Sequence, residues 1–398
     1  MKFLFPILIF FLCCDIKKQN YNNITNSNSV ADKFIIEGRA ALKKHYFFQA
    51  LAYADSADKY SIEKSNVYFF KGRIYSELGQ FNEAEKSYKK VLNVSPNYRG
   101  VWNNLGNNSF RQQQFKQAID YYHKEIINNI APIPLRAMGR AFVELGETDS
   151  AKIYFQNAIK MDPGYAAAYF NLAQLEEDEG NLINALQHSK KAFDLDNNNL
   201  EYQYVFSSLL VQMGQSNEAI DNLKIIVEKW PWHHSAHYNL GRALIHGGQN
   251  ALGESYLEKA ESLRAKQAKI DHLENTVRAV PDDPLSYAVL AFNYRMVGRY
   301  NDAMHSYKVA LYLDSENFDI WNNVANLYLL QGDTTGCLAT YNYILTKNPS
   351  LTNIWINMGV VYALSNKKSK ARNAWEQILK YEPDNIAVIN YLKKLENN

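Results

Sequence analysis

The sequence predicts an all-α repeat protein in which short helix pairs stack into an α-solenoid. Three observations support this fold class. Most of the chain divides into similar segments of 34 residues, and glycine or alanine returns at fixed places within them. Apolar residues also follow the i, i+3, i+4, i+7 spacing of one helix face, as Trp321, Val324, Ala325 and Tyr328 do. Since one helix pair cannot bury its own apolar faces, we expect neighbouring pairs to stack.

The N-terminus does not follow the repeat. Residues 1–14 have one early cation, Lys2, and then an apolar run. As a helix this run spans about 15 Å, too short for a bilayer of about 30 Å, and it is typical of a secretory signal peptide. The cysteines after it resemble the lipobox of bacterial lipoproteins, which implies lipidation of Cys14, with Cys13 as the alternative. An ordinary secretory signal or an uncleaved short anchor are the other possibilities. Residues 15–30 are polar and predict a disordered tether.

The body of the chain divides into ten predicted repeats, seven in residues 31–263 and three in residues 284–385. They start near residues 31, 65, 99, 132, 166, 200, 234, 284, 318 and 352. Each repeat is expected to contain two helices, and Gly332 should end the first helix of the ninth repeat. Residues 386–398 predict a capping helix that covers the last repeat.

An insert at residues 264–283 separates the seventh repeat from the eighth. No glycine or proline interrupts residues 254–280, so the insert either extends the preceding helix or forms a separate helix from a decayed repeat. Its apolar residues Ile270, Leu273 and Val277 share one face, which would pack on the chain itself or contact a partner. Asp283 and Pro284 then predict the N-cap and first residue of the next helix.

The repeat resembles the tetratricopeptide repeat. Its small residues at position 20 are Ala50, Ala84, Ala118, Ala151, Ala185, Ala219, Ala303 and Ala371, with Gly253 and Cys337 in the remaining repeats. Position 8 carries Gly72, Gly106, Gly139 and further small residues, and a terminal proline recurs, as at Pro96 and Pro163. The resemblance implies a right-handed α-solenoid superhelix of about ten helix-turn-helix repeats with a C-terminal cap helix.

The same resemblance implies a concave groove, lined by positions 2, 5, 6, 9 and 13 of each first helix, that binds a protein or an extended peptide. We assign asparagines to position 6, and arginines, Arg295 among them, to position 9. Amides can donate to and accept from a peptide bond, and arginine suits carboxylates, although each arginine could instead be solvated or paired internally. The predicted groove residues are Arg73, Asn103, Asn104, Asn107, Arg136, Arg140, Phe170, Asn171, Tyr204, Tyr238, Asn239, Arg242, Arg295 and Asn323.

A histidine cluster, His233, His234 and His237, raises the question of a metal site. The repeat register places His237 at position 4, which elsewhere holds tryptophan or tyrosine, so we expect it to pack between helices. His246 is nine residues further, about 900° around a helix, and cannot share a metal with His237. No cysteine or carboxylate cluster lies nearby. We therefore predict structural histidines and no metal or other cofactor.

The function predicted is a non-enzymatic interaction scaffold or adaptor. The net charge of +2, without long runs of one sign, argues against nucleic acid as a partner, and the known catalytic motifs are missing from the sequence. We expect a protein of the bacterial cell envelope, lipid-anchored and facing the periplasm or cell surface. The alternative is a structural subunit of a secretion, motility or envelope-assembly complex that uses the solenoid edges and the insert. An enzyme or metal protein is a third possibility, and a homo-oligomer is possible but not indicated.

Overall fold

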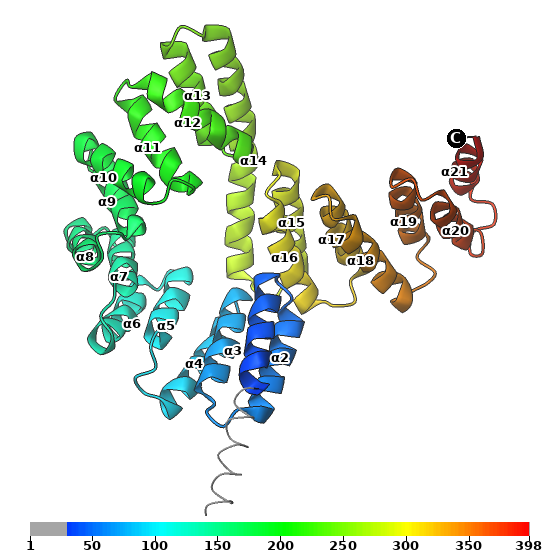
Figure 1. The fold of residues 1–398 in the computed structure, drawn as a ribbon, viewed down its shortest axis with the longest axis horizontal. Coiled ribbons are helices and arrows are strands. Elements are labelled where there is room, and N and C mark those ends of the chain that lie inside the picture. The colour runs from blue at the N-terminus through cyan, green and yellow to red at the C-terminus, as the bar shows by residue number, and fades with distance from the viewer. Residues whose placement is uncertain (1–29, 398) are drawn as a thin grey trace, which may run out of the picture. The chain divides into compact units, whose positions relative to one another are not determined.

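The computed structural model describes residues 30–397, and all of their regular structure is helical (Figure 1). The first helix covers residues 30–43. The next helices are α2 (Phe47–Tyr60), α3 (Ser65–Glu77), α4 (Phe81–Val94), α5 (Val101–Arg111), α6 (Phe115–Asn128), α7 (Pro132–Glu144), α8 (Thr148–Met161), α9 (Ala166–Asp178), α10 (Leu182–Leu195) and α11 (Leu200–Gln212). They are followed by α12 (Ser216–Lys229), α13 (His234–His246), α14 (Asn250–Ala279), α15 (Pro284–Val297), α16 (Tyr300–Leu313), α17 (Phe318–Leu330), α18 (Thr334–Lys347), α19 (Thr352–Leu364), α20 (Lys368–Ile378) and α21 (Ile386–Asn397). The all-α solenoid fold predicted from the sequence is confirmed.

Two compact units make up the chain, unit 1 up to Ala268 and unit 2 from Lys269 onward. Within each unit, a helix packs mainly against the helices before and after it in the sequence, as expected of a solenoid. The first helix of each pair begins within two residues of a predicted repeat start. The predicted signal peptide, Cys14 and all but the last residue of the predicted tether lie outside the described residues.

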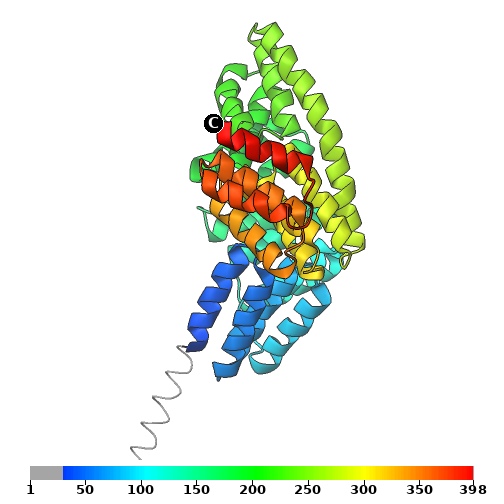
Figure 2. The same ribbon diagram turned by 90° about the vertical axis from the view of Figure 1, so that its right-hand side faces the viewer.

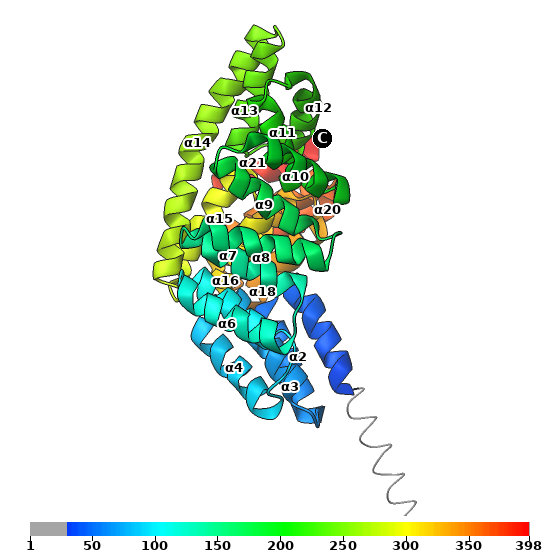
Figure 3. The same ribbon diagram turned by 90° about the vertical axis from the view of Figure 1, so that its left-hand side faces the viewer.

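The insert continues the preceding helix. α14 is a single helix of 30 residues, and it appears unbroken in views from two opposite sides (Figures 2 and 3). Its residue Ile270 is 1% exposed within the core of unit 2, and Leu273 and Val277 pack against that core. The apolar face of the insert is therefore covered by the chain itself. Asp283 caps α15 by accepting from the backbone N–H groups of Leu285 and Ser286, with Pro284 at the first position, as predicted.

Small residues allow the two helices of a repeat to approach closely. A Cβ placed on Gly139 of α7 would lie 2.6 Å from the Cε1 atom of Phe155 on α8, well inside van der Waals contact. The alanines at position 20, such as Ala151, are fully buried. Large aromatic side chains from the second helix fill the space above most glycines at position 8, so the size pattern in the sequence is a packing pattern.

The first helix of each repeat ends in a left-handed turn at position 15. Glycine occupies this position in most repeats, as at Gly332, where φ is 79°. In three repeats His45, Gln113 and Asn366 adopt the same conformation, with φ between 56° and 60°. Since a side chain is disfavoured at positive φ, these three turns are less favourable than their glycine counterparts.

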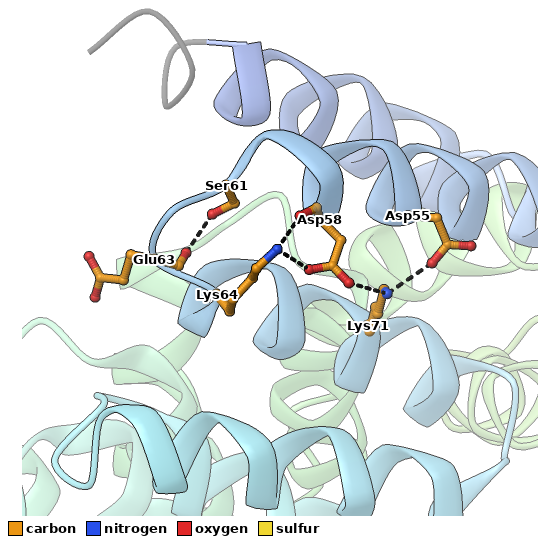
Figure 4. Close-up of polar contacts among 6 residues, drawn as sticks. All are labelled: Asp55, Asp58, Ser61, Glu63, Lys64 and Lys71. Carbon is orange, nitrogen blue, oxygen red and sulfur yellow. Dashed lines mark hydrogen bonds and ion pairs between the residues drawn. The ribbon is translucent and has the colours of Figure 1, made fainter. Parts of the chain in front are cut away.

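An ionic network joins α2 to α3 (Figure 4). Lys71 Nζ lies 2.8 Å from Asp55 Oδ1 and 3.3 Å from Asp58 Oδ2, and Lys64 Nζ lies 2.9 Å from Asp58 Oδ1. Partial burial acts to raise the pKa of Asp58, but the hydrogen bonds and charges of Lys64 and Lys71 outweigh it and lower that pKa. The network supports the first helix pairs of unit 1.

Candidate functional site

A polar pocket in unit 1 contains four of the predicted groove residues. It has a volume of about 470 Å³ and is formed by α7, α8, α9 and the start of α11. Arg136 and Arg140 reach it from α7, and Phe170 and Asn171 reach it from α9. One helical turn separates the two arginines, so both point to the same side of α7. Helix pairing then places the arginines opposite α9.

Arg136 is held in place by hydrogen bonds. Its Nε donates to the Tyr165 hydroxyl at 2.9 Å, and one terminal nitrogen donates to Asn171 Oδ1 at 3.1 Å. The Asn171 amide in turn donates to Gln174 Oε1 at 3.2 Å. These contacts fix the guanidinium and the amide relative to each other, which preorganises one wall of the pocket.

The guanidinium of Arg140 keeps N–H donors that no residue in the described part of the chain uses. Its guanidinium lies 4.9 Å from the centre of the Phe110 ring, and it makes no hydrogen bond or ion pair within residues 30–397. Part of the residue is exposed, yet packing around the guanidinium, followed by the charge of Arg136, lowers the pKa of Arg140. An arginine stays charged under such a shift, so Arg140 offers an unpaired cation with several free N–H groups.

Three carboxylates complete the lining of the pocket, Glu144, Asp178 and Glu201. None of them forms an ion pair in the described part of the chain. The pocket therefore presents separate cations and anions together with the Phe170 ring and the Asn171 and Gln174 amides. Such a lining can bind a polypeptide segment with charged side chains, because it supplies partners for both signs and for peptide groups.

The sequence indicated these acidic residues, but our prediction omitted them. Glu144 and Asp178 occupy position 13 of their repeats, Glu201 occupies position 2 and Gln174 occupies position 9. These positions belong to the set implied for the groove. We selected only arginine, asparagine and aromatic residues from that set, and so missed the anionic part of the pocket.

The predicted asparagines of α5 lie outside this pocket, and their contacts are internal. The Asn104 amide donates to the Gly100 carbonyl oxygen at 2.7 Å, and Asn107 Oδ1 accepts from the Tyr122 hydroxyl at 2.9 Å. Asn103 contributes a backbone N–H to Glu125, while its own Oδ1 is buried without a hydrogen bond in the part of the chain described. The amides of Asn104 and Asn107 therefore each use part of their hydrogen-bonding capacity within the chain.

Further along unit 1, Asn239 of α13 is 9% exposed and donates to Ser208 Oγ at 3.0 Å and to the Tyr204 hydroxyl at 3.4 Å. Tyr238 is 49% exposed, and the Arg242 guanidinium lies 5.9 Å from the centre of its ring. Tyr238 and Arg242 thus remain open to a ligand, whereas Asn239 is used to hold α13 against α11.

Three predicted groove residues lie apart from these clusters. Arg73 is exposed on α3. Asn323 lies on α17 of unit 2, half-buried and without a hydrogen bond to the described residues. The assignment of Arg295 to position 9 was wrong, because α15 begins at Pro284 and position 9 is Phe292. The Arg295 guanidinium packs 5.0 Å from the centre of that phenylalanine ring.

The histidines have structural contacts. His233 Nδ1 accepts from the Ala236 backbone N–H at 3.1 Å and so caps α13, and its ring stacks on Trp230. Burial, followed by the charges of His234 and His237, lowers the pKa of His233 to about 4. His237 is 6% exposed, as predicted for its position, and its Nε2 contacts the Pro231 carbonyl oxygen at 3.1 Å. Within the described residues, no three histidine, cysteine, aspartate or glutamate side chains are grouped to hold a metal ion.

Two tetratricopeptide repeat family models match the chain, one at residues 65–98 and the other at residues 136–199 and 204–268. All three segments lie in unit 1, and the second contains the pocket residues of α7 and α9. None of the helices in residues 30–397 is long and apolar enough to cross a membrane.

Several known proteins are similar at low identity. TPR repeat-containing protein YpiA of Bacillus subtilis (strain 168) is 21% identical over 310 residues, which is 76% of this chain and 67% of that protein. Protein O-mannosyl-transferase TMTC3 of Homo sapiens is 24% identical over 370 residues, 93% of this chain but 33% of that protein. This chain thus spans about two thirds of the first relative and one third of the second.

Among solved structures, the chain is similar to PilF of Pseudomonas aeruginosa, with 15% identity and a TM-score of 0.45 over 52% of this chain and 94% of that one. PilW, described as a widely conserved type IV pilus biogenesis factor, is 18% identical with a TM-score of 0.45 over 51% of this chain and 95% of that one. Together with the family models, the helix pairs of unit 1 identify residues 65–98, 136–199 and 204–268 as tetratricopeptide repeats.

Proposed function

We propose that this protein is a non-enzymatic scaffold or adaptor that binds a protein partner through an extended, charged segment seated in the polar pocket of unit 1. The proposal rests mainly on Arg140, whose guanidinium makes no hydrogen bond or ion pair within residues 30–397. An unpaired guanidinium beside a fixed Arg136–Asn171 pair is a ready site for a carboxylate, because charge-assisted hydrogen bonds to arginine are strong and directional.

The three carboxylates of the pocket indicate which charges a bound segment would carry. Glu144, Asp178 and Glu201 would repel a purely acidic segment and favour one that also carries lysine or arginine. A segment of mixed charge can pair with both the arginines and the carboxylates of the pocket. A segment of a single sign would bring like charges together, which disfavours its binding. The Phe170 ring adds an apolar surface for the stem of a long side chain.

The proposal includes the cell envelope as the site of action. It rests on the apolar run of residues 1–14 and on Cys14 as the lipidated residue. Stable anchoring requires more than one acyl chain, which a lipoprotein-type modification would supply. Replacement of Cys14 by serine should move the protein from the membrane fraction to the soluble fraction, whereas Cys13→Ser should leave it in place. The opposite result would assign lipidation to Cys13, and no change in either variant would contradict a lipid anchor.

The alternative role as a structural subunit relied on the solenoid edges and on the insert as contact surfaces. The apolar residues of the insert pack into the core of unit 2, so one of these two surfaces is already in use. The polar pocket has no such internal occupant.

The test is site-specific photo-cross-linking in the native envelope. Gln174 lines the pocket and is exposed, so a photoreactive phenylalanine analogue placed there would face a bound segment. The matched control carries the same analogue at Arg264 of α14, whose side chain is 71% exposed and outside the pocket. We expect a protein cross-linked at position 174 and not at position 264, identified by mass spectrometry.

Arg140→Ala provides the second arm. It removes no hydrogen bond or ion pair within residues 30–397, so the fold should remain intact while the cross-link at position 174 falls at least tenfold. Equal cross-linking in the parent and the Arg140→Ala variant would refute a role for the pocket, as would equal cross-linking from positions 174 and 264.

A further inference from the structure

The helix α15 of unit 2 is apolar on two opposite faces, and the described residues cover only one of them. Leu290, Ala291 and Tyr294 are buried in the core. On the other side Leu285, Val289, Phe292 and Met296 are 61%, 47%, 44% and 60% exposed. At 3.6 residues per turn, these four lie within about 60° of one another around the helix axis. We call them the α15 ridge.

A ridge of this kind is unusual for a surface helix, whose outward face is normally polar. The equivalent outward positions of α17 carry Asp319, Asn323 and Asn326, with Leu330 as the one large apolar residue. Four large apolar side chains in contiguous turns mark an interaction surface, since single exposed apolar residues are common but contiguous patches are not. The ridge extends about 16 Å, or three helical turns.

The chemistry of the ridge selects the form of its partner. The ridge supplies apolar atoms and no side-chain hydrogen-bond donor or acceptor. An extended peptide lying on it would leave backbone N–H and C=O groups without partners, which is costly once water is displaced. A helix satisfies its own backbone groups and can present an apolar face of matching length. An amphipathic helix of about three turns therefore fits the ridge.

Arg295, beside the ridge, indicates the charge that the partner helix would carry next to its apolar face. The Arg295 guanidinium packs on the Phe292 ring and makes no hydrogen bond or ion pair with the described residues. The nearby Arg299, by contrast, is paired, with its Nε 2.7 Å from Asp302 Oδ2. Docking of an apolar face on Phe292 would bring the partner's adjacent side chain to Arg295, and an acidic residue there would form a charge-assisted hydrogen bond.

We propose that the α15 ridge docks an acidic amphipathic helix of another protein, with an aspartate or glutamate of that helix facing Arg295. This surface lies in unit 2 and takes a different kind of partner from the extended segment assigned to the unit 1 pocket. The two proposals can therefore fail independently.

The test selects peptides from a phage-displayed library of random 16-residue sequences against the full-length chain. A second selection uses the Phe292→Ser/Met296→Ser variant, and a third uses a matched control, Leu364→Ser/Ile386→Ser, which alters residues of unit 2 that are 77% and 74% exposed. We expect the parent and the control to enrich peptides with apolar residues at i, i+3 or i+4, and i+7, together with an excess of aspartate and glutamate. The ridge variant should not enrich them.

An enriched peptide is then titrated by fluorescence anisotropy. Phe292→Ser/Met296→Ser should weaken its Kd at least tenfold, Arg295→Glu should weaken it about tenfold, and Arg140→Ala in unit 1 should leave it unchanged. Unchanged unfolding temperatures establish that the exposed substitutions keep the fold. Enrichment of non-helical patterns, or the same enrichment with the ridge variant, would overturn the proposal. If the parent self-associates in sedimentation experiments and the ridge variant does not, the ridge is a contact between two copies and the proposal is wrong.

Discussion

The helices α7 of unit 1 and α15 of unit 2 occupy equivalent places in their repeats but present opposite surfaces. Both begin with proline, and both carry a small residue at position 8, Gly139 and Ala291. At position 9, α7 has Arg140 where α15 has Phe292, and at position 13 it has Glu144 where α15 has Met296. Positions that face the paired helix are constrained by packing. Outward positions are not, so they can differ between repeats and confer different binding chemistry.

The largest effect should come from reversing the charge that distinguishes α7. Arg140→Glu would place a fourth carboxylate beside Glu144, Asp178 and Glu201, so the pocket would repel the acidic part of its partner. We expect binding of the cross-linked partner to weaken at least 100-fold, about 3 kcal/mol, measured by titration of the purified proteins. Arg264→Glu is the matched control for net charge. Similar affinities of the two variants would show that the pocket does not make this contact.

The units should also respond differently to pH, because each contains a different base whose pKa is lowered by the packing around it. His233 in unit 1 has its pKa lowered from 6.5 to about 4, so the unfolded state binds more protons between those values. Stability then falls as the pH drops through this window, by up to about 3 kcal/mol. His233→Asn keeps an N-cap acceptor and cannot titrate, so it should flatten the dependence of the unfolding temperature between pH 6.5 and 4.

In unit 2 the corresponding group is Lys308, which is 8% exposed and lies over the rings of Trp321 and Tyr328. Burial lowers its pKa from 10.5 to about 8, so its unfavourable contribution is complete below pH 8 and disappears above pH 10.5. Lys308→Met should stabilise unit 2 by roughly 2 kcal/mol at neutral pH. Hydrogen exchange of α16 measures the change, and an unchanged exchange rate would contradict it.

Close helix packing provides a further contrast between α7 and α15. Gly139→Ala would force a Cβ against Phe155 and should cost about 1–3 kcal/mol. Ala291→Gly removes a methyl group and creates no clash. It should cost only about 1 kcal/mol, because glycine has a lower helix propensity than alanine. Hydrogen-exchange protection of α7 and α15 reports each change locally, which suits a repeat protein that unfolds in parts. A milder effect for Gly139→Ala than for Ala291→Gly would reverse the expected order.

The smallest effects concern the left-handed turns at position 15. Gln113→Gly in unit 1 should stabilise its repeat by about 1 kcal/mol or less, because the strain at positive φ exceeds the entropic cost of glycine. Asn366→Gly in unit 2 should change stability less, since asparagine tolerates this conformation better than glutamine does. Thermal unfolding of the two variants compares them directly, and destabilisation by Gln113→Gly would show that its side chain makes a compensating contact.

Much of the fold could be predicted from residue spacing. The starts of the first helices, the small residues at positions 8 and 20, and the cap at Asp283 all follow from local rules of periodicity, size and capping. The continuity of α14 could not be decided in that way. A helix with no internal breaker is compatible with one long helix or with two, and the contact of Ile270 with the core of unit 2 is a tertiary feature.

For the binding surfaces, helical periodicity is enough to identify the positions that point outward, because it assigns each residue to one face of a helix. Which outward side chains remain available depends on the contacts between repeats. Asn239 is taken up by Ser208, 31 residues earlier, and Arg136 by Asn171, 35 residues later, whereas Arg140 and Arg295 stack on aromatic rings and keep free donors. Ser208 and Asn171 belong to neighbouring repeats, so their distances from Asn239 and Arg136 depend on how the repeats stack rather than on residue spacing within one helix.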